Sequence, residues 1–420
     1  MTATDTHSAI EAVFRIEQAK LIAGLARMLR DVGLAEELAQ DALVVALEQW
    51  PRSGIPDKPG AWLMTIAKNR ALDRLRRAKL VDRKHAELEH EQAADGEGHQ
   101  PDLDAMLDDD IGDDLLRLMF TACHPVLSKE ARLALTLRLI AGLKTDEIAR
   151  AFLVPEPTIA QRIVRAKRTL ADKRIPFEVP HGPELGGRLA SVLSVIYLIF
   201  NEGYSATAGD DWMRPQLCEE ALRLGRILAE LAAKESEVHG LVALMELQAS
   251  RLGARRGPNG EPVLLLDQNR ARWDQLLIRR GLEALQRAEA LDETRGTYTL
   301  QAALAACHAR AQTPEETDWA RIVGLYGELS TIAPSPVVEL NRAVALAMLL
   351  GPEAGLRIVD ALVSDPHLKD YHLLPSVRGD LLSKLGRRAE ARTEFERAAA
   401  MTGNSREQAL LLKRAAECAE

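Results

Sequence analysis

The chain has 420 residues, which is more than one compact core usually holds and predicts two to four domains. Hydrophobic residues make up 47% of the sequence and aromatic residues only 4%, a balance typical of an all-helical protein. The formal net charge of -8 argues against a protein that coats nucleic acid over its whole surface. Local charge therefore decides which stretches are candidates for nucleic-acid binding.

The cysteines and the first residues bear on the compartment. The cysteines are Cys123, Cys218, Cys307 and Cys418. They are far apart and form no C-x-x-C pair, which predicts a reduced, cytoplasmic protein without a zinc site. The first residues lack the basic and apolar regions of a signal peptide. The longest apolar run, 189–200, is too short to span a bilayer.

Residues 8–50 predict two or three helices, of which the clearest runs over 35–50 and ends at Pro51. This helix has two apolar faces. One consists of Leu38, Ala42 and Val45, and the other of Leu43, Leu47 and Trp50. A helix that is apolar on two sides is either deeply buried or in contact with a partner, and the pattern leaves both open.

A loop and a basic helix follow. The segment 51–60 is rich in Pro and Gly, which predicts a loop. In a helix over 59–77 the core-facing positions are Leu63, Ile66, Ala67 and Ala71. Another side carries Thr65, Asn69, Asp73 and Arg76, with Arg70, Arg74 and Arg77 at its edge. Polar groups flanked by phosphate-binding cations suit a nucleic-acid-binding helix, although a solvated charged helix has the same pattern.

Both helices resemble segments of bacterial sigma factors, especially the extracytoplasmic-function (group IV) class. A-W-L-x-T-I-A-x-N-x-A-L-D-x-L-R-R, from Ala61, is similar to the promoter-melting helix. A-E-E-L-A-Q-D-A-L-V-V-A-L, from Ala35, is similar to the segment that docks on the clamp helices of the largest RNA polymerase subunit. The resemblance implies core-polymerase contacts from Glu37, Gln40, Asp41, Val44 and Leu47. It implies contacts with the -10 promoter strand from Lys58, Trp62, Thr65, Asn69, Arg70, Asp73, Arg74, Arg76 and Arg77.

Within that set, Lys58 and Trp62 stand where the family captures a base flipped from the melted -10 element. Extruding a base costs a few kcal/mol and needs a pocket and a stacking surface. Trp62 fits the position of a core anchor equally well.

An acidic stretch separates this region from the next. Residues 85–116 contain no Lys or Arg, and acidic side chains, Gly96, Gly98 and Pro101 accumulate there, which predicts a flexible linker over 86–114. The linker is a solubilising spacer or, as the resemblance implies, a segment that threads through polymerase toward the RNA path. It contains no D-x-[DN]-x-[DN]-G pattern, so we expect no metal site.

Residues 115–175 predict a second compact unit. A helix over 129–141 precedes a short helix with Thr145 as its N-cap, and a turn at 153–156 leads to a helix that has Pro157 at its first position. The inward face of this last helix is Ile159, Ile163, Ala166 and Leu170. A short helix, a tight turn and a second helix with a polar, basic outer face form a helix-turn-helix.

The stretch from Gly142 to Leu170 resembles the -35-reading domain of sigma factors along its whole length, apart from Ala160, where many relatives carry Lys. The resemblance implies contacts with -35 DNA from Thr145, Thr158, Gln161, Arg162, Arg165, Lys167 and Arg168. Cys123 and His124 lie just upstream without further ligands, so we expect a structural role for them.

From about Pro176 onward the sequence predicts amphipathic helices separated by short turns. The expected ranges are 188–202, 215–233, 236–252, 267–290, 297–310, 317–330, 337–350 and 354–363. Ala354, Ala361 and Pro366 recur 37 residues later as Ala391, Ala398 and Gly403. This spacing fits a tetratricopeptide-like repeat. Such pairs stack into a solenoid whose concave face suits a protein or peptide partner.

One polar phrase in this part, Tyr197-Leu-Ile-Phe-Asn-Glu-Gly-Tyr-Ser-Ala206, could suggest a catalytic cluster. No nucleophile-base pair, phosphate-binding loop or zinc motif accompanies it, so a polar bend that anchors the first solenoid helices is the better interpretation. The phrase also resembles the C-terminal extension of one subgroup of extracytoplasmic-function sigma factors. L-L-D-Q-N-R-A-R-W-D, from Leu265, and S-P-V-V-E-L-N-R-A-V-A, from Ser335, resemble it as well.

We therefore predict an all-α chain with sigma region 2 at 1–85, an acidic linker at 86–114, a region 4 helix-turn-helix at 115–175 and a tetratricopeptide-like regulatory domain at 176–420. The short join at 174–180 predicts direct packing of this last domain on the -35 domain. The expected partners are core RNA polymerase and promoter DNA, with no membrane, enzymatic activity, metal or cofactor. Two alternatives stay open. One is a polymerase-independent helix-turn-helix regulator whose solenoid senses a ligand or peptide, and the other is a solenoid enzyme or scaffold.

Overall fold

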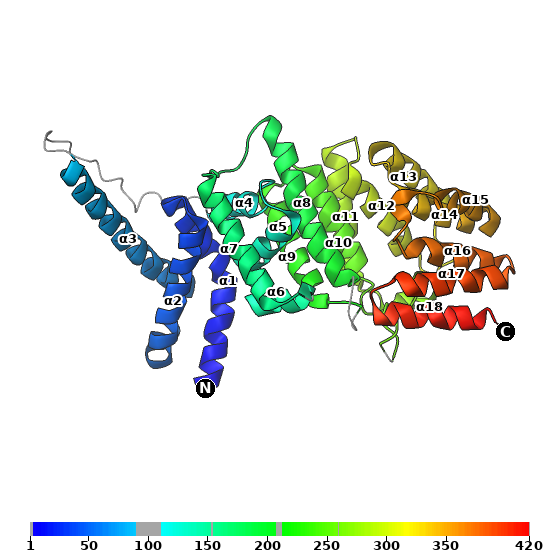
Figure 1. Ribbon diagram of the computed structural model, residues 1–420, viewed down its shortest axis with the longest axis horizontal. Helices are drawn as coiled ribbons and strands as arrows, with labels where there is room; N and C mark the ends of the chain where they lie inside the picture. Colours follow the sequence, from blue (N-terminus) through cyan, green and yellow to red (C-terminus); the bar gives the residue numbers. More distant parts are fainter. Residues whose placement is uncertain (1–2, 90–110, 153, 207–211, 259, 420) are drawn as a thin grey trace. The chain divides into compact units, whose positions relative to one another are not determined.

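The computed structural model describes residues 3–89, 111–152, 154–206, 212–258 and 260–419, without the side chains of 3–9, 11, 12, 15, 77–89 and 111–113. These residues form α-helices, three short 3-10 helices and one isolated β-bridge between Arg256 and Pro262, and none of them lies in a strand (Figure 1). The predicted all-α fold is confirmed. The chain divides into two units, Met1–Val195 and Ile196–Glu420.

Three long helices begin the first unit: α1 (Ala3–Leu29), α2 (Val32–Ser53) and α3 (Pro59–Glu89). They pack on one another around the buried side chains of Leu25, Leu38, Trp50 and Leu63. The carboxylate of Asp31 caps α2 by accepting from the backbone N–H groups of Gly33 and Leu34 at 2.8 and 3.0 Å.

The end of α2 differs from the prediction. The helix runs through Pro51 to Ser53 and ends at Gly54, which has φ of 84° and donates its backbone N–H to the carbonyl of Trp50. A proline so near the end of a helix removes only one hydrogen bond, and a glycine in the left-handed region closes the helix without steric cost.

Four shorter helices complete the core of the first unit: α4 (Ile111–Ala122), α5 (Lys129–Leu139), α6 (Thr145–Phe152) and α7 (Glu156–Asp172). α1 packs against α4, and α7 packs against α5 and α6. Because α3 reaches Glu89 and α4 begins at Ile111, both ends of the predicted linker are helical, and its residues 90–110 lie outside the described part. α6 begins at Thr145, so its N-cap is Lys144 and not Thr145 as predicted. The carboxylate of Glu147 accepts from the backbone N–H of Lys144 at 2.7 Å.

The division between the units falls inside α8 (Pro183–Tyr204). In its first half, Arg188 donates to the carbonyl of Phe120 at 3.0 Å and the hydroxyl of Ser191 donates to the carbonyl of Cys123 at 2.7 Å. The start of the predicted C-terminal domain therefore packs on α4 and α5. Within the described residues, α8 is also long and apolar enough to cross a membrane, and 44% of its most apolar window is buried.

The first half of the second unit has its own core. It contains α9 (Pro215–Leu231), α10 (Ser236–Ala249), α11 (Gln275–Leu291), α12 (Thr297–Arg310) and α13 (Trp319–Ile332). The helix expected over 267–290 begins only at Gln275. Two 3-10 turns, η1 (Leu265–Asp267) and η2 (Arg270–Arg272), precede it, and Asp274 caps it.

The last helices form a second core: α14 (Pro336–Leu350), α15 (Pro352–Leu362), α16 (Leu373–Lys384), α17 (Arg388–Met401) and α18 (Ser405–Glu417). α14 packs with α15 and α16 with α17, as the repeat predicts. The register differs by one residue, because buried Gly355 and Val359 correspond to buried Ala391 and Phe395 at a spacing of 36. Ala354 and Ala361, which the sequence predicted at the contact between the helices, are less buried than Gly355. A Cβ added to Gly355 would lie 2.6 Å from the carbonyl oxygen of Ala343, so the helices approach closely at this glycine.

Candidate polymerase and promoter interface

The outer surface of α2 carries the five residues predicted to contact polymerase. Val44 is 51% exposed, so its aliphatic side chain is accessible to a partner. Glu37 is exposed, and Gln40, Asp41 and Leu47 are half-buried. Trp50, which was expected on the same apolar face as Leu47, is fully buried. The available surface is therefore narrower than the sequence suggested and centres on Val44.

The residues predicted to contact the -10 strand lie on α3 and just before it. Thr65, Asn69, Asp73, Arg74 and Arg76 are exposed on the helix, and Lys58 is exposed ahead of it. The side chain of Arg77 lies outside the described residues. Leu63, Ala67 and Ala71 are buried, and Ile66 is half-buried, so the division of α3 into an inner and an outer face matches the prediction.

The sequence left open whether Trp62 anchors the core or offers a stacking surface, and its surroundings are compatible with both. It is half-buried, and its ring meets the buried Trp50 edge-on with centroids 5.2 Å apart. Contact with Trp50 fixes the orientation of the ring, while its remaining exposure leaves part of the aromatic surface available for stacking.

Two ion pairs connect the outer surfaces of α2 and α3. Arg70 binds Asp41 at 2.8 Å and Arg74 binds Glu37 at 2.5 Å. All four side chains are at least 40% exposed, so each pair contributes little to stability, about 0–1 kcal/mol. Each pair joins a predicted polymerase contact to a predicted DNA contact, and either partner is released at low cost.

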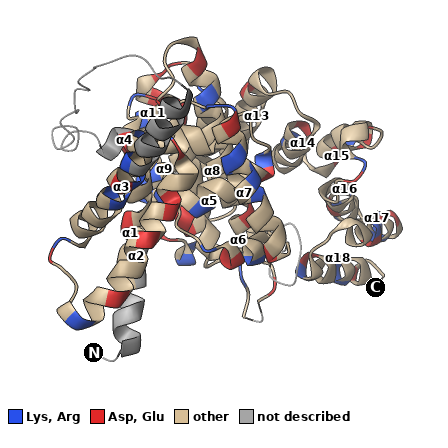
Figure 2. Ribbon diagram, turned by 60° about the vertical axis from the view of Figure 1, so that its left-hand side comes forward, with Lys and Arg blue, Asp and Glu red and all other residues tan. Residues whose placement is uncertain are grey.

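In the helix-turn-helix, α7 presents a basic outer face. Ile159, Ile163, Ala166 and Leu170 are all buried, as predicted. Gln161, Arg165 and Arg168 are exposed, whereas Thr158, Arg162, Lys167 and Thr169 are half-buried. Its basic residues can be followed in blue in Figure 2. The exposed members are accessible to a partner in this structure, and their contact with DNA stays a prediction.

A buried carboxylate between α2, α5 and α7 was not anticipated. Glu36 is only 3% exposed and accepts from Nε of Arg138 at 2.7 Å and from the side-chain amide of Gln40 at 2.9 Å. Lys167 forms an ion pair with its other oxygen. The predicted DNA contact Lys167 is thus bound to Glu36 in this structure. The sequence contained one sign of this buried carboxylate, because Glu36 lies one helical turn from Val32 and Ala39 on an otherwise apolar face.

Two sigma-factor profiles match separate stretches of the first unit. The profile of sigma-70 region 2 matches residues 13–81, from within α1 to within α3, and the profile of sigma-70 region 4 matches residues 117–170, from within α4 to near the end of α7. The probable ECF RNA polymerase sigma factor SigI of Mycobacterium tuberculosis is 27% identical over 175 residues, 41% of this chain and 58% of that protein. The two matched regions and this relative support an extracytoplasmic-function type of sigma factor.

Other relatives extend or support this assignment. The ECF RNA polymerase sigma factor SigK of a Mycobacterium species is 26% identical over 159 residues, 37% of this sigma factor and 77% of its own length. An uncharacterized protein of Rhizobium meliloti is 44% identical over 388 residues, 92% of this sigma factor and 90% of that protein. Residues 188–289 also match a family of unknown function. The helices after region 4 are therefore shared with a relative along nearly its whole length.

The side chains of Cys123 and His124 form hydrogen bonds within the fold. The thiol of Cys123 lies 3.3 Å from the hydroxyl of Thr136, and burial raises its pKa to about 11. Nδ1 of His124 accepts from the backbone N–H of Val126 at 3.1 Å. The described residues include no group of three metal-binding side chains.

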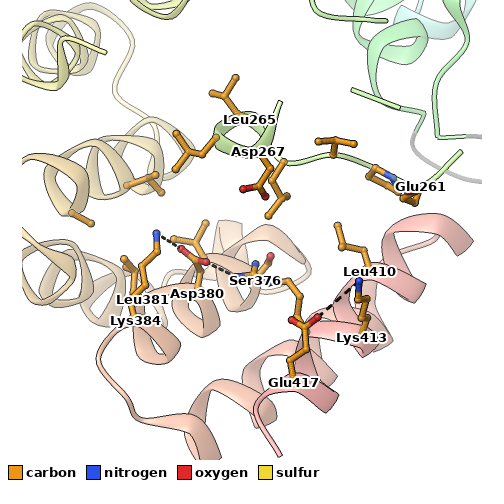
Figure 3. A pocket seen from close by; sticks show the side chains of 18 of the residues that line it. Glu261, Leu265, Asp267, Ser376, Asp380, Leu381, Lys384, Leu410, Lys413 and Glu417 are labelled. Carbon is orange, nitrogen blue, oxygen red and sulfur yellow. Dashed lines mark hydrogen bonds and ion pairs between the residues drawn. The ribbon is translucent and has the colours of Figure 1, made fainter. Parts of the chain in front are cut away.

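The second unit of the sigma factor contains a groove of about 960 Å³ between residues 261–267 and helices α14, α16 and α18 (Figure 3). Leu265, Leu381 and Leu410 give it apolar surface. Three of its ion pairs are Asp380–Lys384, Asp380–Arg414 and Lys413–Glu417, and with Glu261, Asp267 and Arg406 the lining holds four acidic and four basic side chains. A molecule bound there would be recognised by shape and apolar contact more than by net charge.

Proposed function

We propose that this sigma factor binds core RNA polymerase through the surface of α2 centred on Val44 and directs transcription initiation at promoters read by α3 and α7. The observation that carries this proposal is the order of the two sigma regions on one chain, each with apolar residues buried on its inner face and predicted contact residues that are exposed or half-buried on its outer face. α3 would engage the opened -10 strand, and Arg162 and Arg165 would contact the -35 duplex, where Arg pairs bidentately with guanine.

The experiment is complex formation with purified core RNA polymerase, followed by size-exclusion chromatography and native mass spectrometry. A stoichiometric complex supports the proposal. If the chain binds DNA duplexes alone and never associates with core polymerase, it acts instead as a polymerase-independent helix-turn-helix regulator.

The residues after region 4 would regulate this activity, in cis or through a protein or peptide partner. The domain is tethered to the DNA-binding regions, so even weak contacts act at a high effective concentration. The groove beside α16 and α18 is a candidate surface for a peptide. The tetratricopeptide-like packing of α14 to α17 and the resemblance of residues 197–206 to a subgroup with a C-terminal extension support this part of the proposal.

Truncation gives the sign of the regulation, and the structure indicates where to cut. Ending the chain near Pro176 would remove Arg188 and Ser191, which bond to the carbonyls of Phe120 and Cys123. Ending it after Tyr204 keeps α8 complete. Higher transcription from the folded truncated protein indicates inhibition by the removed helices, and lower transcription indicates that they are required. Equal transcription contradicts regulation.

A further inference from the structure

The second unit contains a cavity that the sigma-factor function does not use. It has a volume of about 650 Å³ and is lined mainly from α8, α10, α12, α13 and α14, with Leu265 of η1 and Leu373 of α16 also in the lining. A volume of this size accommodates a single small organic molecule. Because five helices line it, the cavity depends on tertiary packing rather than on one loop.

The charge of the lining has one sign. Among the described residues that line the cavity, Arg251 is the only one with an ionised side chain at neutral pH, and none is Asp or Glu. Arg251 has no ion-pair partner among the described residues. Its guanidinium donates to the phenol oxygen of Tyr204 at 2.5 Å and to the side-chain oxygen of Gln248. Both are neutral acceptors, so its charge is hydrogen-bonded but not neutralised.

Aromatic rings hold Arg251 in place, and two further arginines add positive charge near it. Its guanidinium carbon lies 5.9 Å from the ring centroid of Tyr204 and 5.7 Å from that of Trp273. Arg255 lies over the same Tyr204 ring, with its guanidinium carbon 3.5 Å from the centroid. Burial, and then the charge of Arg251, lower the pKa of Arg255 and of Arg270. The region is therefore cationic and favours an anion.

The rest of the lining is neutral and rich in hydrogen-bonding groups. The hydroxyl of Tyr197 donates to the amide oxygen of Gln301 at 3.2 Å. Nδ1 of His308 is buried and accepts or donates no hydrogen bond within the described part of the chain. Burial and the neighbouring arginines lower the pKa of His308 to about 4, so its ring is neutral at pH 7. Burial raises the pKa of Tyr326 to about 12, which keeps its hydroxyl protonated.

We propose that this cavity binds a small organic monocarboxylate, with the carboxylate on Arg251 and a planar body between Tyr197, Tyr326 and His308. A single ionised group matches a single negative charge, and guanidinium is suited to planar carboxylates. Aromatic and amide side chains complement a flat body that carries its own polar groups.

The polar phrase at the end of α8 supplies part of the lining, and the phrase from Leu265 supplies Leu265 itself and two residues that contact the lining. Tyr197, Asn201 and Tyr204 come from the polar phrase at the end of α8, which is more than a bend. Arg270 and Trp273 come from L-L-D-Q-N-R-A-R-W-D. Trp273 packs on Arg251, and Arg270 donates to the carbonyl of His308 at 2.9 Å. Eight of the lining residues, Arg251 among them, lie in residues 188–289, the part that matches a family of unknown function, and the others lie after it.

The test is ligand binding by the full-length protein. The probes are 4-hydroxybenzoate, phenylacetate and indole-3-acetate. The controls are 4-hydroxybenzamide, which is uncharged, and inorganic phosphate, which is an anion without an organic group. Binding is followed by the thermal midpoint and by tryptophan fluorescence, because Trp273 contacts Arg251 and Trp319 lies 5.4 Å from the ring of His308. We expect at least one carboxylate to bind with a Kd of about 1 mM or tighter, and the amide and phosphate to bind about tenfold more weakly.

Variants tie any binding to this cavity. Arg251→Met removes the charge, and Ala305→Phe fills the space while keeping the charge. Each should weaken carboxylate binding about tenfold or more. Arg357→Met, an exposed arginine on α15, is the matched control and should bind as the parent does. The proposal is overturned if no carboxylate probe binds, if amide and carboxylate bind equally, or if Ala305→Phe folds and binds like the parent.

Discussion

At the residue scale, Glu36 makes the most consequential set of contacts in the first unit. It is a buried carboxylate between helices that belong to different sigma regions, and Arg138 and Lys167 bind its two oxygens. A buried ion pair adds little compared with apolar packing, but removing one partner leaves the other charge uncompensated. Glu36 therefore links the fold of α2 to the position of α7.

Glu36→Gln should lower the free energy of unfolding by about 3 kcal/mol, because Arg138 and Lys167, which are only 20% and 23% exposed, lose the buried carboxylate that balances their charge. Urea denaturation followed by circular dichroism measures the change. Glu37→Gln is the matched control, since Glu37 is exposed and its pair with Arg74 is worth about 1 kcal/mol or less. Equal losses for the two variants would contradict the role given to Glu36.

The arginines of α7 and its lysine should behave differently in DNA binding. Arg162→Ala and Arg165→Ala should each weaken binding to duplexes selected from a random library by about 1–3 kcal/mol and change the preferred sequence. Lys167→Ala should change DNA binding less and protein stability more, because Lys167 is bound to Glu36. Fluorescence anisotropy over a salt series makes the comparison.

A uniform loss across sequences with a shallower salt slope would reassign Arg162 and Arg165 to phosphate contacts. No effect from either variant would contradict the assignment of α7 as the recognition helix.

At the element scale, helices with one apolar face could be predicted from the sequence, and irregular ends could not. The inner face of α7 followed from steps of four, three and four, because that period is set by helix geometry alone. The predicted end of α2 at Pro51 was wrong, because Gly54 ends this helix. The predicted start of α11 was also wrong, because two short 3-10 turns precede the helix. The carboxylate of Glu36 and the cavity at Arg251 combine residues far apart in the chain, which no local pattern brings together.

The surface of α2 gives a prediction about its partner. Val44→Asp should weaken core-polymerase binding more than about tenfold, because an unpaired charge in a desolvated contact is costly. Its melting temperature should stay close to that of the parent, since Val44 is 51% exposed. Val363→Asp is the control, as this valine is 40% exposed in the second unit. Unchanged polymerase binding by Val44→Asp would place the interface elsewhere.

The paired helices of the second unit depend on a close approach at Gly379. A Cβ there would lie 2.9 Å from the ring of Phe395, so either the ring or the helix has to move. Gly379→Ala should destabilise the protein by about 1–3 kcal/mol in urea denaturation. Gly324→Ala is the control, because nothing lies within 4 Å of its added Cβ and alanine favours the helix. A neutral Gly379→Ala would mean that the two helices can separate freely.

At the scale of the whole molecule, the chain combines two sigma regions with a longer helical part. The first half of α8 packs on α4 and α5, and its second half begins the unit that holds both the groove and the cavity. A ligand in the cavity would bind residues of α8 directly. Such a site gives the C-terminal part a chemical input that is separate from DNA and polymerase.

Transcription in vitro tests the central claim most directly. Purified core RNA polymerase is incubated with a promoter library, with and without the full-length chain, and the transcript starts are sequenced. We predict that starts appear at defined positions only when the chain is present, that they share -10 and -35 elements, and that Val44→Asp abolishes them. Starts that are the same with and without the chain, from polymerase that does not bind it, would contradict the assignment of this chain as an active sigma factor.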